Sequence, residues 1–259
     1  MGMKINVLYL GKMEFPMFRL VDCRDESIMV ESPAVAILIQ HPTLGNILYD
    51  TGNSADSERL YTPKMLHNYP ITEHIGIREA LAAHGLTPND IDLLIVSHLH
   101  FDHAGGLSEF VGTKAIRRVL VSEADLKNAW FSVTTGHGGA YIRSLFDVEG
   151  IQFWTINRTT QLTDDFTLFI QESHTPGVIG MILKTENNGT IITTSDAVYT
   201  RKSYEQRIAP GGDINKTDDE FFDNLSVLKK LREKHDGATL FFGHDYDQVM
   251  DYVARGTID

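Results

Sequence analysis

The residues best suited to carry chemistry lie in one short segment, 97–106. It holds His98, His100, Asp102 and His103 within six positions, directly after the apolar run 91–96. In an extended chain, residues two apart point to the same side, so the first three can converge, and a turn through the following glycine pair brings His103 toward them. Imidazole and carboxylate are ligands that zinc accepts, and an open coordination position makes such a site catalytic. This density of donors favours a catalytic metal site over a polar loop whose histidines cap a helix.

Three further candidate ligands follow apolar segments elsewhere in the chain. His174 lies just beyond 166–170, Asp196 follows 190–195, and His244 follows 240–243. Loops at strand ends are where functional side chains gather, so we expect these donors to join the first cluster. Asp50 also ends an apolar run, and its carboxylate is predicted to lie beneath the site and orient a ligand histidine.

The remaining histidines and the cysteine give weaker signals. We predict surface positions for the histidines in turns and on polar helix faces, which are His41, His67, His74, His84 and His235. His137 has glycine-rich neighbours, and both a pocket and a surface position stay open. Cys23 is the only cysteine, which excludes an internal disulfide and a thiolate-rich zinc site.

The elements that must position these residues alternate along the chain. Strands are predicted near 1–10 (ending at Gly11), 35–40, 46–50, 91–96, 118–121, 166–170, 180–184, 190–194 and 239–243, and helices near 77–84, 123–130 and from Thr217 onward. Both halves thus place strands before helices, which predicts two similar sheets packed face to face with helices outside. We expect one domain over 1–259, with a loop or helical insertion around 123–150 that covers the substrate.

Composition limits the possible partners. The formal net charge of −12 and pI near 5.3 argue against a surface that binds nucleic acid. No run reaches the roughly 18 apolar residues of a membrane-spanning helix, and the N-terminal residues lack a small-residue cleavage site. A cytoplasmic protein without nucleic-acid or membrane partners is therefore expected.

These motifs together resemble the metallo-β-lactamase superfamily, whose signature HxHxDH is met by His98, His100, Asp102 and His103, and whose later ligands are matched by His174, Asp196 and His244. The resemblance implies an α/β fold, a four-layer αββα sandwich, with two zinc ions. It implies that His98, His100 and His174 bind the first zinc, that Asp102, His103 and His244 bind the second, and that Asp196 bridges both.

Within this superfamily, the chain looks most like the N-acyl homoserine lactone hydrolases. Tyr199, three residues after the bridging aspartate, is the distinguishing residue. The resemblance implies that a lactone ring is opened by a metal-bridging hydroxide, that Tyr199 donates to the carbonyl oxygen, and that Asp102 carries a proton to the departing alkoxide. The separation from Asp196 favours His174 as the third ligand of the first zinc, with Val178 as the alternative register.

Other activities of the same fold stay open. A glyoxalase II-like thioester hydrolase would use the same metal ligands, and a catalytically silent metal-binding protein would keep them without turnover. A nuclease-like phosphodiesterase is disfavoured by the net charge. The expected substrate is a small lactone or ester, and the expected state is a monomer or homodimer. Apolar residues that could line an acyl channel are Met13, Phe15, Met17, Phe18, Trp130, Phe131 and Tyr141.

Overall fold

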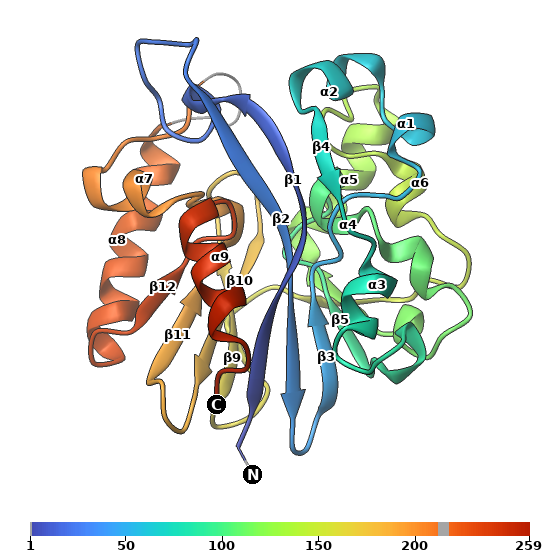
Figure 1. The fold of residues 1–259 in the computed structure, drawn as a ribbon, viewed down its shortest axis with the longest axis vertical. Coiled ribbons are helices and arrows are strands. Elements are labelled where there is room, and N and C mark those ends of the chain that lie inside the picture. Colours follow the sequence, from blue (N-terminus) through green and yellow to red (C-terminus); the bar gives the residue numbers. More distant parts are fainter. Residues whose placement is uncertain (1, 212–217) are drawn as a thin grey trace.

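The structure is a computed structural model that describes residues 2–211 and 218–259. Within these ranges the strands form two sheets that face each other, as Figure 1 shows. The larger sheet has the order β4-β1-β2-β3-β5-β6-β7. Its strands are β1 (Lys4–Pro16), β2 (Met29–His41), β3 (Gly45–Tyr49), β4 (Ile71–His74), β5 (Leu93–Ile95), β6 (Val119–Ser122) and β7 (Phe153–Ile156).

The smaller sheet has the order β12-β11-β10-β9-β8. Its strands are β8 (Thr160–Gln161), β9 (Phe166–Gln171), β10 (Val178–Lys184), β11 (Thr190–Thr193) and β12 (Thr239–Phe241). Both sheets are mixed. In the larger one β3, β5, β6 and β7 run parallel, and in the smaller one β11 and β12 do.

The helices lie outside this pair of sheets. The larger sheet is flanked by α1 (Ser57–Leu60), α2 (Pro63–Asn68), α3 (Ile77–Ala82), α4 (Phe101–Ala104), α5 (Glu123–Thr134) and α6 (Arg143–Phe146). The smaller sheet is covered by α7 (Arg201–Gln206) and α8 (Asp218–Lys234), and α9 (Tyr246–Arg255) packs on β1 and β2. Short 3-10 turns are η1 (Met17–Arg19), η2 (Pro88–Asp90), η3 (Leu107–Phe110), η4 (Ala115–Arg117) and η5 (Ser195–Ala197).

Alternating side chains in the strands explain the layers. Along β2, Ala36 and Leu38 pack toward the helices, whereas Ile37 and Ile39 pack toward the smaller sheet. All four are at most 3% exposed. A strand apolar on both faces must be covered on both faces, so the pattern produces the predicted αββα sandwich, and that prediction is confirmed.

The first strand is longer than expected. It does not end at Gly11, because Gly11 adopts φ +96° in a bulge that shifts the pairing between Tyr9 and Lys12, and the strand continues to Pro16. A Cβ on Gly11 would lie 2.1 Å from the carbonyl oxygen of Glu73 on β4. The bulge therefore lets β4 pair closely with β1.

Two predictions are tested only in part by the described residues. Thr217, the expected start of a helix, lies outside the described residues, and α8 begins at Asp218. Residues 123–150 contain α5 and α6. That this segment is an insertion in a single domain stays a prediction. No helix of the described ranges is long and apolar enough to cross a membrane.

Candidate metal centre

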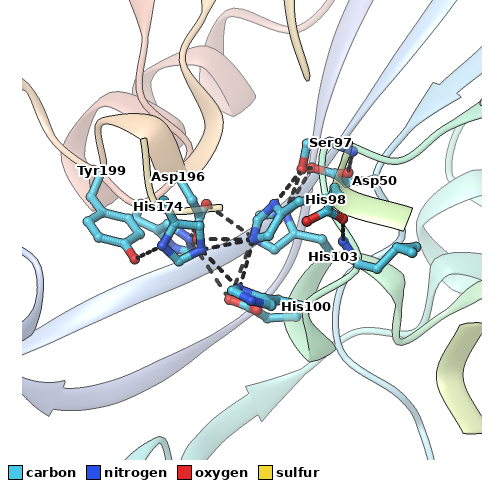
Figure 2. Close-up of polar contacts among 12 residues, drawn as sticks. Asp50, Ser97, His98, His100, His103, His174, Asp196 and Tyr199 are labelled. Carbon is cyan, nitrogen blue, oxygen red and sulfur yellow. Dashed lines mark hydrogen bonds and ion pairs between the residues drawn. The ribbon is translucent and has the colours of Figure 1, made fainter. Parts of the chain in front are cut away.

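All seven predicted ligands lie close together, beyond the ends of strands β5, β9, β11 and β12. They form two groups, which we call the first donor group (His98, His100, His174) and the second donor group (Asp102, His103, Asp196, His244). His98 follows β5, His174 follows β9, Asp196 follows β11, and His244 follows β12. His100 stands at the N-cap of α4, and this helical turn carries Asp102 and His103 toward the second donor group. Strands distant in sequence thus deliver the two groups side by side (Figure 2).

In the first donor group three ring nitrogens form a small triangle. His174 Nε2 lies 3.1 Å from His98 Nε2 and 2.9 Å from His100 Nδ1, and the latter two nitrogens are 3.1 Å apart. A tetrahedral zinc with Zn–N bonds of about 2.0–2.1 Å holds its nitrogen ligands about 3.3 Å apart. The observed spacing suits a shared cation of this size. His174 and not Val178 completes this triangle, and the role of His174 as the third ligand stays a prediction.

Asp196 stands between the two groups. Its Oδ1 lies 3.0 Å from His244 Nε2 and 3.1 Å from His103 Nε2. Its Oδ2 faces the other way and lies 3.4 Å from His174 Nε2 and 3.7 Å from His98 Nε2. One carboxylate oxygen thus points to each donor group, as a bridging ligand requires.

The second donor group also fits a metal ion. His103 Nε2 is buried and makes no hydrogen bond of good geometry, although Asp196 and Asp102 lie nearby. A buried polar nitrogen without a partner is costly. Neutral imidazoles and ionised carboxylates are the donors that divalent zinc accepts in an open site, so a cation here would supply the missing partner.

The ring nitrogens that face away from the donor groups are held by hydrogen bonds. The Nδ1 atoms of His98, His103, His174 and His244 contact Ser97 Oγ (3.1 Å), Asp50 Oδ2 (2.8 Å), Tyr199 Oη (2.9 Å) and Ser32 Oγ (2.9 Å), respectively. Such partners fix the tautomer and orientation of a ligand histidine. The predicted position of Asp50 beneath the site is confirmed.

Asp50 also joins the loop after β3 to the loop after β5. Its carboxylate accepts hydrogen bonds from the amide and the hydroxyl of Ser97, at 2.6 and 2.8 Å. Asp50, His174 and Ser195 all have positive φ, at 62°, 72° and 46°. Backbone strain of this kind, in residues other than glycine, is typical of sites whose surroundings hold them in place.

The histidines of the two donor groups differ in the direction in which burial and nearby charges shift their pKa values. Burial lowers the pKa values of His98 and His100 well below that of free histidine, and it lowers the pKa of His174 to about 4. Burial also opposes charge on His103 and His244, but Asp196 and Asp102 outweigh it and raise their pKa values. Without a metal ion the first donor group is therefore neutral, whereas the carboxylates of the second donor group favour protonation of its histidines, a charge that a bound cation would replace.

Tyr199 borders the first donor group. The side chain is 4% exposed, and its hydroxyl points to His174 (Figure 2). Burial, followed by the charge of Asp196, raises its pKa well above that of free tyrosine. The phenol therefore keeps its proton at neutral pH.

Several side chains lie elsewhere than expected or escaped prediction. His41 is not on the surface: it is 6% exposed, and Asp165 and Thr43 bind its two ring nitrogens, because the β2–β3 turn folds against the start of β9. His137 is exposed. Ser32 was missed because a lone serine in a strand carries no signal beyond its place before Pro33.

Asp125 was missed because an acidic residue in the first turn of a helix looks like an ordinary helix-start residue. It is fully buried, accepts hydrogen bonds from Tyr141 Oη (2.6 Å) and the Leu99 amide (2.8 Å), and thereby holds the loop of the first donor group. The Tyr141 ring lies 4.4 Å from that of His100.

A cleft of about 300 Å³ opens beside His244. Among the residues that line it are Met17, Leu20, Val21, Val30 and Lys202. Of the predicted channel residues, Met17 lines this cleft, while Met13 and Phe15 are buried in the apolar cluster that contains Tyr199. Phe131 is 68% exposed, and Trp130 packs on Phe146.

The sandwich and paired donor groups agree with the family comparison. The model of the metallo-beta-lactamase superfamily matches residues 30–244, so the chain belongs to this superfamily. Among its relatives is the N-acyl homoserine lactonase AiiA of Bacillus thuringiensis subsp. kurstaki, 30% identical over 212 residues that make up 79% of this chain and 78% of the relative.

Two further comparisons point the same way. The N-acyl homoserine lactonase AttM of Rhizobium radiobacter is 29% identical over 239 residues, which cover 86% of this chain and 85% of the relative. A solved N-acyl homoserine lactone hydrolase, with N-hexanoyl-L-homoserine bound at its catalytic metal center, superimposes with a TM-score of 0.82 at 24% identity. It covers 97% of each chain, and at this identity it supports the shared fold.

Proposed function

We propose that the chain is a dizinc hydrolase that opens a lactone ring, with N-acyl homoserine lactones as its substrates. The observation that carries the proposal is the contact of Tyr199 with His174 at the edge of two adjacent donor groups. This arrangement sets an aimed proton donor beside a place for two divalent cations. The lactonase relatives, which cover most of this chain, support the same chemistry.

The first donor group would hold one zinc ion, Asp102, His103 and His244 would hold the second, and Asp196 would serve both. When bound, the ions would polarise the substrate carbonyl and lower the pKa of water toward ~7, which supplies a nucleophile at neutral pH. The residues around them orient the donors. Asp50, Ser97 and Ser32 do so through hydrogen bonds to the outward ring nitrogens.

The tautomer of His174 decides what Tyr199 can do. Use of Nε2 as a metal ligand would leave the ring proton on Nδ1, which would then donate to Tyr199 Oη, 2.9 Å away. The phenolic proton is thereby free to donate to the lactone carbonyl oxygen, where negative charge develops. A donor aimed at that oxygen typically contributes ~3 kcal/mol to catalysis.

Ring opening requires a proton for the departing oxygen. Water adds at the carbonyl carbon, the bond from that carbon to the ring oxygen breaks, and the ring oxygen becomes a hydroxyl. Asp102 is a buried member of the second donor group, and burial raises its pKa. A carboxyl with a raised pKa suits proton transfer, so we assign this role to Asp102.

The cleft beside His244 suits an acyl chain, because Met17, Leu20, Val21 and Val30 give it an apolar wall. We further propose that the protein is a cytoplasmic monomer or homodimer. The formal net charge of −12 supports the absence of a nucleic-acid partner.

A substrate panel tests the proposal. The metal-loaded protein is given acyl homoserine lactones of graded chain length, a matched acyl thioester and a phosphodiester, and hydrolysis is followed by proton release. We expect lactones to be the fastest substrates, His174→Ala to abolish turnover, and the exposed control His137→Ala to retain it. Faster turnover of the thioester would contradict the proposal.

A further inference from the structure

His100 is held differently from the other predicted ligand histidines. It faces the first donor group with Nδ1, which lies 2.9 Å from His174 Nε2 and 3.1 Å from His98 Nε2 (Figure 2). Within residues 2–211 and 218–259, its other ring nitrogen has no hydrogen-bond partner. Instead the His100 ring packs on that of Tyr141, with centroids 4.4 Å apart and planes at 63°. The orientation of His100 therefore depends on what holds Tyr141 in place.

Tyr141 is held by Asp125. The Oδ1 atom of Asp125 accepts a hydrogen bond from Tyr141 Oη at 2.6 Å, and Asn128 Nδ2 donates to the same phenolic oxygen at 3.1 Å. The backbone of Tyr141 also pairs with that of His100 in an antiparallel bridge. Tyr141 is 7% exposed and Asp125 is fully buried. Both the backbone and the side chain of Tyr141 are thus fixed relative to His100.

The second oxygen of the Asp125 carboxylate holds the segment that carries His98 and His100. This Oδ2 atom accepts a hydrogen bond at 2.8 Å from the amide of Leu99, which stands between the two histidines. A carboxylate only accepts hydrogen bonds, so it satisfies the amide and the phenol at once. A side-chain amide of the same shape would turn its NH₂ group toward one of these donors and leave that donor without an acceptor. The position therefore requires an acid rather than its amide.

The start of α5 also touches the loop that carries His174. A Cβ on Gly177 would lie 2.0 Å from Oγ of Ser122, the N-cap of α5, so this loop runs directly against the helix start. The hydroxyl of Thr175, the residue after His174, lies near the Asp125 carboxylate, although no hydrogen bond of good geometry joins them. One buried carboxylate thus lies beside the segments that carry all three members of the first donor group.

The second donor group has a carboxylate of its own. Asp50 Oδ2 lies 2.8 Å from His103 Nδ1. Within the described ranges, Asp125 forms no hydrogen bond or ion pair with a member of the second donor group. The two donor groups are therefore supported by different buried acids.

We propose that Asp125, acting through Tyr141 and Leu99, is a positioning residue that determines how tightly the first donor group binds its metal ion and leaves the second donor group unaffected. This inference rests on the proposed function and deepens it, because it gives one residue control over one of the two metal sites. Partners that orient a ligand histidine typically contribute about 10- to 100-fold to metal affinity.

Variants that keep a single donor group separate the two sites. His244→Ala leaves the first donor group to be measured, and His100→Ala leaves the second. Calorimetric titration with Zn²⁺ gives the Kd of each metal-free protein. Asp125→Asn should weaken binding about 10- to 100-fold when added to His244→Ala, but less than about threefold when added to His100→Ala. Glu123→Gln is the matched control, because its carboxylate lies in the same helical turn but pairs with Lys127, and it should change neither Kd.

Tyr141→Phe is a second variant that decides the question if Asp125→Asn does not fold. It keeps the ring on His100 and loses the phenolic hydrogen bond, so it should weaken the first donor group's Zn²⁺ binding by about 3- to 10-fold. Equal weakening of both donor groups, or no weakening of the first by either variant, would overturn the inference. These titrations do not depend on turnover, so a wild type that hydrolyses no lactone would refute the proposed function alone.

Discussion

At the scale of single residues, the Tyr199 hydroxyl can accept one hydrogen bond and donate another. In the proposed function, its oxygen accepts a hydrogen bond from His174 Nδ1, 2.9 Å away, and its proton is then free for the substrate. Tyr199→Phe should therefore lower kcat about 100-fold, equivalent to ~3 kcal/mol, with two metal ions per chain retained. Steady-state kinetics with metal analysis checks this. Tyr204→Phe is the control, because its ring packs on Phe242 and, within the described residues, makes no ring contact with a donor histidine. A loss below about threefold in Tyr199→Phe would contradict the assignment.

Asp125 gives a prediction about pH and stability. Burial raises its pKa to about 6, from the ordinary 3.8. The folded state thus binds this proton more tightly than the unfolded state, so the residue's contribution to stability falls as pH rises from about 4 to 6, by roughly 3 kcal/mol. Denaturant unfolding of both metal-free proteins should show that the stability of the wild type relative to Asp125→Asn falls by this amount over that pH range, because groups common to both proteins cancel in the difference. Parallel pH profiles would contradict it.

At the scale of elements, the loop after β3 and the glycines after α4 approach each other closely. A Cβ on Gly105 would lie 2.4 Å from the Ser54 amide nitrogen and 2.6 Å from the Gly52 carbonyl oxygen. Gly105→Ala should therefore destabilise the protein by about 1–3 kcal/mol and reduce its metal content. Gly76→Ala is the control, since a Cβ there meets nothing within 4 Å. Unchanged unfolding of Gly105→Ala would show that these loops can move apart.

The sequence was sufficient to predict the elements with strong periodicity and the donor residues that follow strand ends. The strands around His98, Asp196 and His244 could be predicted because apolar runs end at polar residues. The continuation of β1 past Gly11 could not, since it depends on a bulge stabilised by β4, which is distant in sequence. His41, Ser32 and Asp125 were misjudged or missed because their partners come from other elements, and one-dimensional patterns carry no such information.

At the scale of the whole molecule, the donor groups connect the two halves of the sandwich. His98 and His100 follow a strand of the larger sheet, whereas His174, Asp196 and His244 follow strands of the smaller one. Metal bound there would link both sheets and stabilise only the folded chain. At a free metal concentration about a thousandfold above Kd, bound metal should add about 4 kcal/mol to the free energy of unfolding, and chelation should remove this amount. Calorimetry checks this, and an unchanged Tm after complete metal removal would contradict it.

A dinuclear lactonase centre is tested most directly by titrating the metal-free protein with Zn²⁺ while hydrolysis of an acyl homoserine lactone is followed. If activity requires both donor groups, it should rise to its maximum only as the second equivalent binds. Full activity at one equivalent, or no lactone hydrolysis at two, would contradict a dinuclear lactonase.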